Sequence, residues 1–208
     1  MKNILCFGDC NTFGKDAHGN RFPRHIRWTG KTQQLLGEDF YLIEEGLEGR
    51  TTIWDDPLLP HRCGMTALPI SLLTHKPLDL VVLSLGTNDC KRYFRVSAEE
   101  IASGMEELVK KIQSSTGISK GKTTVLILAP VPIGEKISRS KSLEYDETSR
   151  MKSLELGSLY QQIATLRNCA FLDASNFATV GSDHLHLEEE SHLRTAEEMA
   201  KKIQEMFS

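Results

Sequence analysis

The sequence contains no apolar run near the roughly 20 residues that a membrane-spanning helix requires. It also has no excess of basic residues: the formal net charge is −3, which removes the electrostatic case for a nucleic-acid or membrane partner. The first apolar run begins so close to the N-terminus that it leaves no room for a secretory signal. These absences predict a cytoplasmic protein that binds neither membranes nor nucleic acid.

Paired cysteines are missing as well. The five cysteines are scattered along the chain, and no two of them form a C-x-x-C motif. An odd, scattered set argues against a disulfide framework and against structural zinc, and it favours a reducing compartment. His184 and His186 form a close pair, but their spacing suits a helical metal site poorly and no third ligand is apparent. We therefore expect no metal ion and no cofactor, and we expect the other histidines, including His192, at the surface or at helix caps.

The residues that are present have an ordinary globular composition. Apolar residues make up 39% of the 208 residues and charged residues 25%, which fits a single domain over residues 1–208. Near-continuous Val, Ile and Leu without polar alternation is typical of parallel strands covered on both faces. Five short apolar runs have this character and are predicted as strands: residues 3–7, 40–45, 80–85, 124–129 and 170–173.

Helical patterns fill the intervals between these runs. Ser97 and Glu100 have the spacing of a capping box, and an apolar face at the helical period follows them. Residues 145–167 and 191–207 show a similar pattern. Strands alternating with helices predict an α/β fold, with a five-stranded parallel sheet covered by helices on both faces.

Four polar segments stand where such a sheet places its functional sites, beyond the carboxyl ends of strands. They are GDCNT (residues 8–12), EEGLEGRTT (44–52), GTND (86–89) and DHLH (183–186). Acyl transfer needs a nucleophile, a base, a group that orients the base, and donors for an oxyanion. Cys10 is the candidate nucleophile, at a predicted helix N-terminus that favours an anion. A turn through Asp-x-x-His would place Asp183 and His186 together as orienting carboxylate and base.

In order and context the four segments resemble the motif blocks of the SGNH (GDSL-type) hydrolases. The similarity is closest to a branch of arylesterases and acyltransferases, some of which act as perhydrolases. RWTG, EEGL-x-x-RTT, DDP, PLDLV, LGTND and YFR recur in that branch; here they occupy residues 27–30, 44–52, 55–57, 77–81, 85–89 and 93–95. The resemblance implies a flavodoxin-like three-layer α/β/α sandwich. It also implies an esterase that cleaves small acyl esters through an acyl-enzyme, without a cofactor, as a homo-oligomer.

The resemblance also implies site residues that spacing alone would not assign. The oxyanion hole would consist of the backbone N–H groups of Cys10 and Gly49 and the side-chain amide of Asn88. 

Residues beside the same motifs are candidates for the substrate pocket: Asp9, Thr12, Trp54 and Thr87. Asp9 could instead only fix the turn that it begins. Trp54 could equally be a packing residue.

Cys10 departs from the family pattern, which has serine at this position. A thiol beside histidine can be a strong nucleophile. Sulfur is larger than oxygen, however, and a pocket shaped for a hydroxyl would misplace it at a cost in rate. Three interpretations stay open: a natural cysteine nucleophile, a replaced serine with weakened activity, and an inert thiol. No residue near Cys10 is altered to suit a sulfur atom, and this favours the second interpretation, a replaced serine.

Other functions also stay open. A carbohydrate O-acetyl deacetylase would use the same catalytic groups, although aromatic residues, at 7%, are few for a sugar site. A binding module of the same fold without turnover is compatible with Cys10. A redox-sensing thiol protein would need a partner such as Cys90 within disulfide distance. Residues 131–150, where the resemblance is weak, are a candidate lid or subunit contact.

Overall fold

The computed structural model describes residues 1–119, 123–137 and 143–208. Five parallel strands form one sheet in the order β2-β1-β3-β4-β5. The predicted strands are confirmed to within two residues at each end. Their bounds are β1 (Lys2–Gly8), β2 (Phe40–Gly46), β3 (Leu80–Ser84), β4 (Thr124–Ala129) and β5 (Ala170–Asp173).

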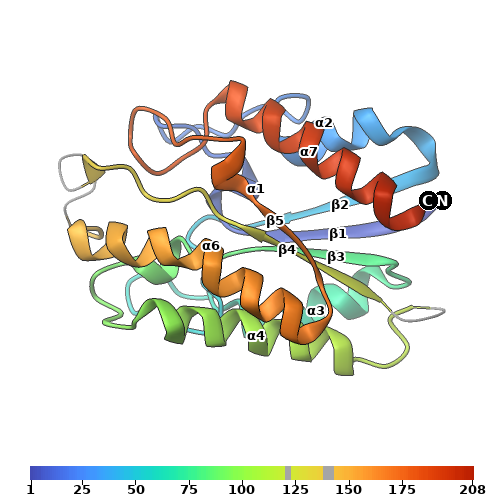
Figure 1. The fold of residues 1–208 in the computed structure, drawn as a ribbon, viewed down its shortest axis with the longest axis horizontal. Helices are drawn as coiled ribbons and strands as arrows, with labels where there is room; N and C mark the ends of the chain where they lie inside the picture. The colour runs from blue at the N-terminus through green and yellow to red at the C-terminus, as the bar shows by residue number, and fades with distance from the viewer. Residues whose placement is uncertain (120–122, 138–142) are drawn as a thin grey trace.

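Helices cover both faces of the sheet, so the predicted three-layer sandwich is confirmed (Figure 1). One outer layer holds α2 (Trp28–Leu36) and α7 (Glu189–Phe207), and the other holds α3 (Gly64–His75), α4 (Ala98–Ser114) and α6 (Glu147–Arg167). Four shorter elements complete the described parts: α1 (Cys10–Phe13), η1 (Gly37–Asp39), η2 (Asn88–Cys90) and η3 (Ala174–Asn176). Within the described segments, no helix is both long and apolar enough to cross a membrane.

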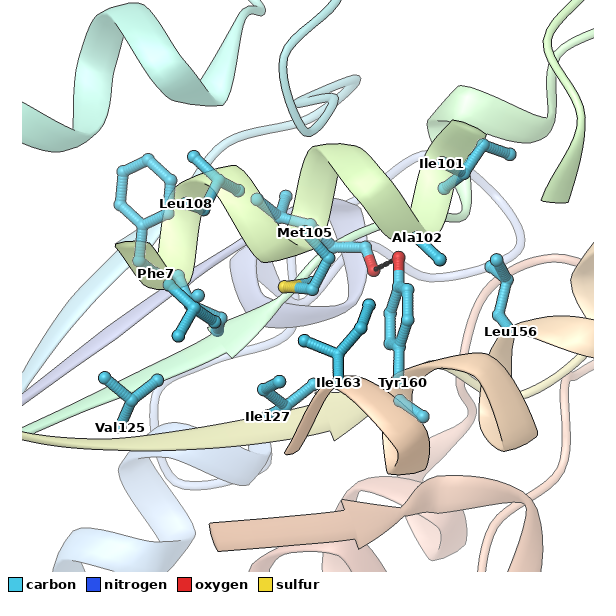
Figure 2. Packing of buried hydrophobic residues seen from close by; sticks show 14 of the residues in the cluster. Phe7, Ile101, Ala102, Met105, Leu108, Val125, Ile127, Leu156, Tyr160 and Ile163 are labelled. Carbon is cyan, nitrogen blue, oxygen red and sulfur yellow. Dashed lines mark hydrogen bonds between the residues drawn. The ribbon is translucent and has the colours of Figure 1, made fainter. Parts of the chain in front are cut away.

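The described residues form two cores, and the larger lies between the sheet and the layer of α3, α4 and α6. Side chains from α4 and α6 converge there on the strands (Figure 2). Met105 and Tyr160 are wholly buried in this core, and the Tyr160 hydroxyl donates to the Leu85 carbonyl over 3.2 Å. Because Leu85 follows directly after β3, this bond holds the end of that strand against α6.

The predicted capping box of α4 is present. The Ser97 hydroxyl accepts from the Glu100 N–H at 3.2 Å, and the Glu100 carboxylate accepts from the Ser97 N–H at 2.7 Å. Each residue thereby satisfies a backbone donor that the helix itself leaves free. The helices predicted near residues 145–167 and 191–207 are α6 and α7.

Among the helices of the described segments, α2 and α3 were not predicted. The α3 segment GMTALPISLLTH is apolar almost throughout, so it shows no helical period, and it contains Pro69. Ile70 and Leu73 on this helix are exposed. The α2 segment has the opposite composition, with mostly polar residues and no continuous apolar stripe. Periodicity detects a helix only when one face is apolar and the other polar.

His192 was expected at the surface or at a helix cap; the surface position is wrong, whereas its ring does cap the N-terminus of α2 at Trp28. This histidine is completely buried in α7, where its Nδ1 accepts from the Trp28 N–H at 3.3 Å. Burial, with a contribution from the charge of Arg27, lowers its pKa to about 4, so the imidazole is neutral at pH 7. His192 therefore serves as a polar link between α7 and α2.

Replacing Ser97 with alanine should lower the free energy of unfolding by about 1 kcal/mol, because the α4 N-terminus loses its cap. Ser103→Ala is the matched control: it removes an exposed hydroxyl that bonds the Glu99 carbonyl in the same helix. The control should change stability by no more than about 0.5 kcal/mol. Chemical denaturation measures both variants, and equal losses would contradict a specific capping role.

Candidate functional site

The candidate site begins at the carboxyl end of β1, where the chain turns directly into the one-turn helix α1. Asp9 is the N-cap residue, and its carboxylate accepts from the Asn11 N–H at 3.1 Å. Cys10 is the first residue of the helix and is partly exposed. The turn therefore presents the Cys10 sulfur at the edge of the sheet, as the sequence predicts.

The Asp183–His186 turn faces this cysteine. The Asp183 Oδ2 and the His186 Nδ1 are 2.6 Å apart, and the Asp183 Oδ1 accepts from the His186 and Leu185 N–H groups at 2.9 and 3.1 Å. The Asn11 side-chain oxygen accepts from the Leu187 N–H at 2.9 Å. Since Asn11 and Leu187 are the neighbours of Cys10 and His186, this bond fixes the two segments relative to each other.

The charges of this turn are stabilised in place. Burial opposes the imidazolium form of His186, but the hydrogen bonds to Asp183 and Cys10 outweigh it and raise the pKa of His186 to about 9. Burial likewise favours the neutral acid of Asp183. The hydrogen bonds that His186 donates from its ring and its backbone outweigh that effect and lower the pKa of Asp183 to about 2. Asp183 is thus an anion at pH 7, and its charge makes His186 a stronger base than a free imidazole.

Two hydrogen-bond donors from other loops reach the same sulfur. The Gly49 N–H lies 3.2 Å from the Cys10 Sγ, and the Asn88 Nδ2 lies 3.8 Å from it. Gly49 has φ of 76°, in the left-handed region that favours glycine. The structure therefore brings together the five residues predicted for catalysis and for the oxyanion hole.

The Asn88 amide is itself held on both sides. Its Nδ2 donates to the Arg50 carbonyl at 3.2 Å, and its Oδ1 accepts from the Tyr145 hydroxyl at 3.2 Å. Tyr145 was not predicted as a site residue. No motif surrounds it in the sequence, so only the fold identifies it.

Buried charged residues tie the Gly49 loop to its neighbours. The Arg50 Nη1 donates to the Gly8 carbonyl at 3.1 Å, and the Arg50 guanidinium lies 4.0 Å from the centre of the Phe7 ring. The Asp89 carboxylate accepts from the N–H and the hydroxyl of Thr52, at 2.9 and 2.6 Å. Asp89 is therefore a structural residue that connects the loops after β2 and β3.

A cleft of about 330 Å³ opens beside the sulfur. Cys10, Gly49, Asn88 and His186 all line it, so a ligand in the cleft would contact each of these groups. The volume is sufficient for a small ester, because small-molecule sites commonly measure about 300–1,000 Å³.

Five charged side chains, beside Leu59, Tyr145 and Leu185, form the rest of the wall. Lys15 pairs with Glu48, and the Lys91 Nζ lies 3.3 Å from the Glu144 Oε1. Arg62 also lines the cleft, and its Nη1 donates to the Pro60 carbonyl at 2.9 Å. The cleft is thus more polar than a site for a long acyl chain would be.

The four residues predicted for the substrate pocket do not line this cleft. Asp9, Thr12 and Thr87 are buried, and the Asp9 carboxylate is engaged in capping α1. Trp54 is partly buried, and its carbonyl accepts from the Thr51 hydroxyl at 2.5 Å. These residues are close to the motifs in the sequence, but in the fold they lie beneath or beside the site. Other residues form the cleft wall.

The remaining cysteines and histidines add no second centre. All five cysteines are free thiols, so Cys10 and Cys90 are not joined in a disulfide. Among residues 1–119, 123–137 and 143–208, no group of three or more His, Cys, Asp and Glu side chains could hold a metal ion.

The candidate lid at residues 131–150 is described only in part, since residues 138–142 lie outside the described ranges. Glu144 and Tyr145, from its described part, form a wall of the cleft. Its role as a lid or subunit contact stays a prediction.

Comparisons with known proteins identify similar chains. A model of the GDSL-like lipase/acylhydrolase family matches residues 6–194. Est24, a carbohydrate acetylesterase from Sinorhizobium meliloti, is 36% identical, with a TM-score of 0.94 and 100% of both chains covered. The aryl esterase of M. smegmatis is 37% identical, with a TM-score of 0.90 and 99% of each chain covered. Among curated proteins, no sequence matches significantly.

A more distant structure, the lipase/acylhydrolase from Enterococcus faecalis, is 17% identical. It aligns with a TM-score of 0.72 over 99% of this chain and 97% of its own. At this identity the likeness concerns the fold alone.

Replacing Asp183 with asparagine should lower the pKa of His186 below about 9, because the imidazolium loses its negative partner. NMR titration of the protein with ¹⁵N-labelled histidine measures this value. His192, with a pKa of about 4, is an internal control that should titrate as before. An unchanged titration of His186 would show that Asp183 does not stabilise its charged form.

Proposed function

The chain is an ester hydrolase of the GDSL-like lipase/acylhydrolase family, and from this premise we propose that it cleaves short-chain acetyl and aryl esters through an intermediate on Cys10. The observation that carries the proposal is the surroundings of one sulfur atom. Two hydrogen-bond donors, the Gly49 N–H and the Asn88 Nδ2, lie 3.2 and 3.8 Å from it, and His186 lines the same cleft.

Acylation follows from this arrangement. The neutral form of His186 is the base: as the Cys10 sulfur attacks the ester carbonyl carbon, the thiol proton passes to the His186 Nε2, since Nδ1 is engaged by Asp183. The carbonyl oxygen becomes an oxyanion that accepts from the N–H groups of Cys10 and Gly49 and from the Asn88 amide. When the tetrahedral intermediate collapses, the alkoxide leaves with the proton from His186, and a thioester remains on Cys10.

Deacylation repeats the same steps with water. His186 takes a proton from water as the oxygen attacks the thioester carbonyl, and the same donors hold the oxyanion. Collapse releases the carboxylic acid and returns the proton to the sulfur. An alcohol or a peroxide in place of water would give acyl transfer. Asp183 stabilises the imidazolium that forms in both halves.

The proposal treats Cys10 as a replaced serine. The donors that surround the sulfur are those that the family uses around a smaller oxygen, and a misplaced nucleophile slows attack. We expect weak turnover or a long-lived thioester. If the misplaced sulfur abolishes turnover altogether, the chain is a binding module.

A carbohydrate O-acetyl deacetylase is the second candidate. The similarity to a carbohydrate acetylesterase favours it, as do the charged residues of the cleft wall, which can bond hydroxyl groups. A panel of aryl acetates and acetylated sugars separates the two functions by their relative kcat/KM.

Incubation with an aryl acetate should add one acetyl group to the chain, and peptide mapping by mass spectrometry should place it on Cys10. Cys10→Ala should show neither the adduct nor turnover. Cys10→Ser should raise turnover about tenfold or more, because the pocket then holds the smaller atom.

The outcomes separate the alternatives. Lower turnover in Cys10→Ser would identify a genuine cysteine enzyme. If the unmodified protein forms no adduct and Cys10→Ser has no turnover, esterase function is excluded in favour of binding.

A further inference from the structure

Tyr145 contributes to the site from a segment that contains none of the four motifs. Its side chain is about 99% buried, being only 1% exposed, and it lies in the core that α4 and α6 form against the sheet. Its hydroxyl reaches out of this core to the Asn88 Oδ1 at 3.2 Å. A buried tyrosine hydroxyl is costly unless it is hydrogen-bonded, so this contact stabilises the ring in its present place.

The residues on both sides of Tyr145 are fixed. The Glu144 carbonyl accepts from the Arg92 N–H at 2.8 Å, and the Glu144 carboxylate is 3.3 Å from the Lys91 Nζ. Asp146 caps α6 by accepting from the Ser149 N–H at 3.1 Å. The backbone is therefore held immediately before and after Tyr145, which gives its hydroxyl a defined position.

The Asn88 amide has two orientations, related by a half-turn, that exchange its donor and its acceptor. In the observed orientation Nδ2 donates to the Arg50 carbonyl and faces the Cys10 sulfur, while Oδ1 accepts from Tyr145. The opposite orientation would set Oδ1 against the Arg50 carbonyl, with two acceptors in contact. It would also present an acceptor to the oxyanion, where a donor is needed.

We propose that Tyr145 is a positioning residue, whose hydroxyl holds the Asn88 amide in place so that Nδ2 stays directed at the oxyanion. The inference rests on the proposed esterase function of the same site. The Arg50 carbonyl, which can only accept, selects the orientation of the amide, and the Tyr145 hydroxyl fixes its position from the other side. Burial raises the pKa of Tyr145 well above its usual value, so the hydroxyl keeps its proton to donate at all working pH values.

The first test compares Tyr145→Phe with the unmodified chain in the hydrolysis of an aryl acetate. Removing an oxyanion donor lowers the rate by about 10²–10³-fold, and loosening the donor without removing it should lower the rate less. We expect kcat to fall about tenfold and KM to change less than twofold, because Tyr145 acts through Asn88 in the transition state. Tyr160→Phe is the matched control: it removes an equally buried hydroxyl that bonds the Leu85 carbonyl.

A double-mutant cycle separates positioning from general structural damage. In an Asn88→Ala background, Tyr145→Phe should have almost no further effect on kcat, since the amide that it positions is gone. A fall of the same size in both backgrounds would overturn the proposal, as would an unchanged kcat in Tyr145→Phe alone.

An NMR measurement tests the same inference without turnover. The side-chain amide signals of Asn88 should shift or broaden in Tyr145→Phe and stay unchanged in Tyr160→Phe. Unchanged Asn88 signals in Tyr145→Phe would refute the positioning role even if the chain has no esterase activity. Shifted Asn88 signals in a chain without esterase activity would refute the proposed function but support the contact between Tyr145 and Asn88.

Discussion

The candidate site depends on hydrogen bonds that tie the loops after β1, β2 and β3 to one another. Parallel strands deliver these loops to one edge of the sheet, but a shared edge does not set atomic distances. Arg50 joins the β2 loop to the Gly8 carbonyl, and Asp89 joins the β3 loop to Thr52. These buried links place the Gly49 N–H and the Asn88 amide around one sulfur atom. The geometry at Cys10 is therefore a property of the loop connections more than of the cysteine itself.

Such links place charge in the interior. Burial raises the pKa of both Asp9 and Asp89 to about 6, and it lowers that of Arg50 to about 10. Each shift means that the charged form is less stable here than in water. The hydrogen bonds from Asn11 to Asp9 and from Thr52 to Asp89 offset part of this cost. A site that keeps such groups loses some stability in exchange for fixed geometry.

Much of the fold, and the catalytic positions Cys10, Asp183 and His186, could be predicted from local signals in the sequence, whereas the oxyanion roles of Gly49 and Asn88 follow only from the family resemblance. Buried parallel strands are continuous apolar runs, and the Ser97 capping box marks the start of α4. The Asp183–His186 turn could be predicted because its two side chains are close in sequence. The uniformly apolar α3 and the mostly polar α2 have no helical period of apolar residues, so the sequence does not reveal them as helices.

Other features have no local signal. The burial of His192 has no local signal because it depends on Trp28, a residue far away in the chain. Tyr145 and the cleft wall depend on contacts between remote segments. Asp9, Thr12 and Thr87 are buried and do not line the cleft, because nearness to a motif does not specify which side of a loop faces the ligand.

The most direct measurement is a crystal structure of the chain trapped with an acetyl group on Cys10. The account predicts that the acyl oxygen lies about 2.7–3.1 Å from both the Gly49 N–H and the Asn88 Nδ2, with the His186 ring facing the thioester. An acyl oxygen turned toward solvent and away from both donors would contradict it.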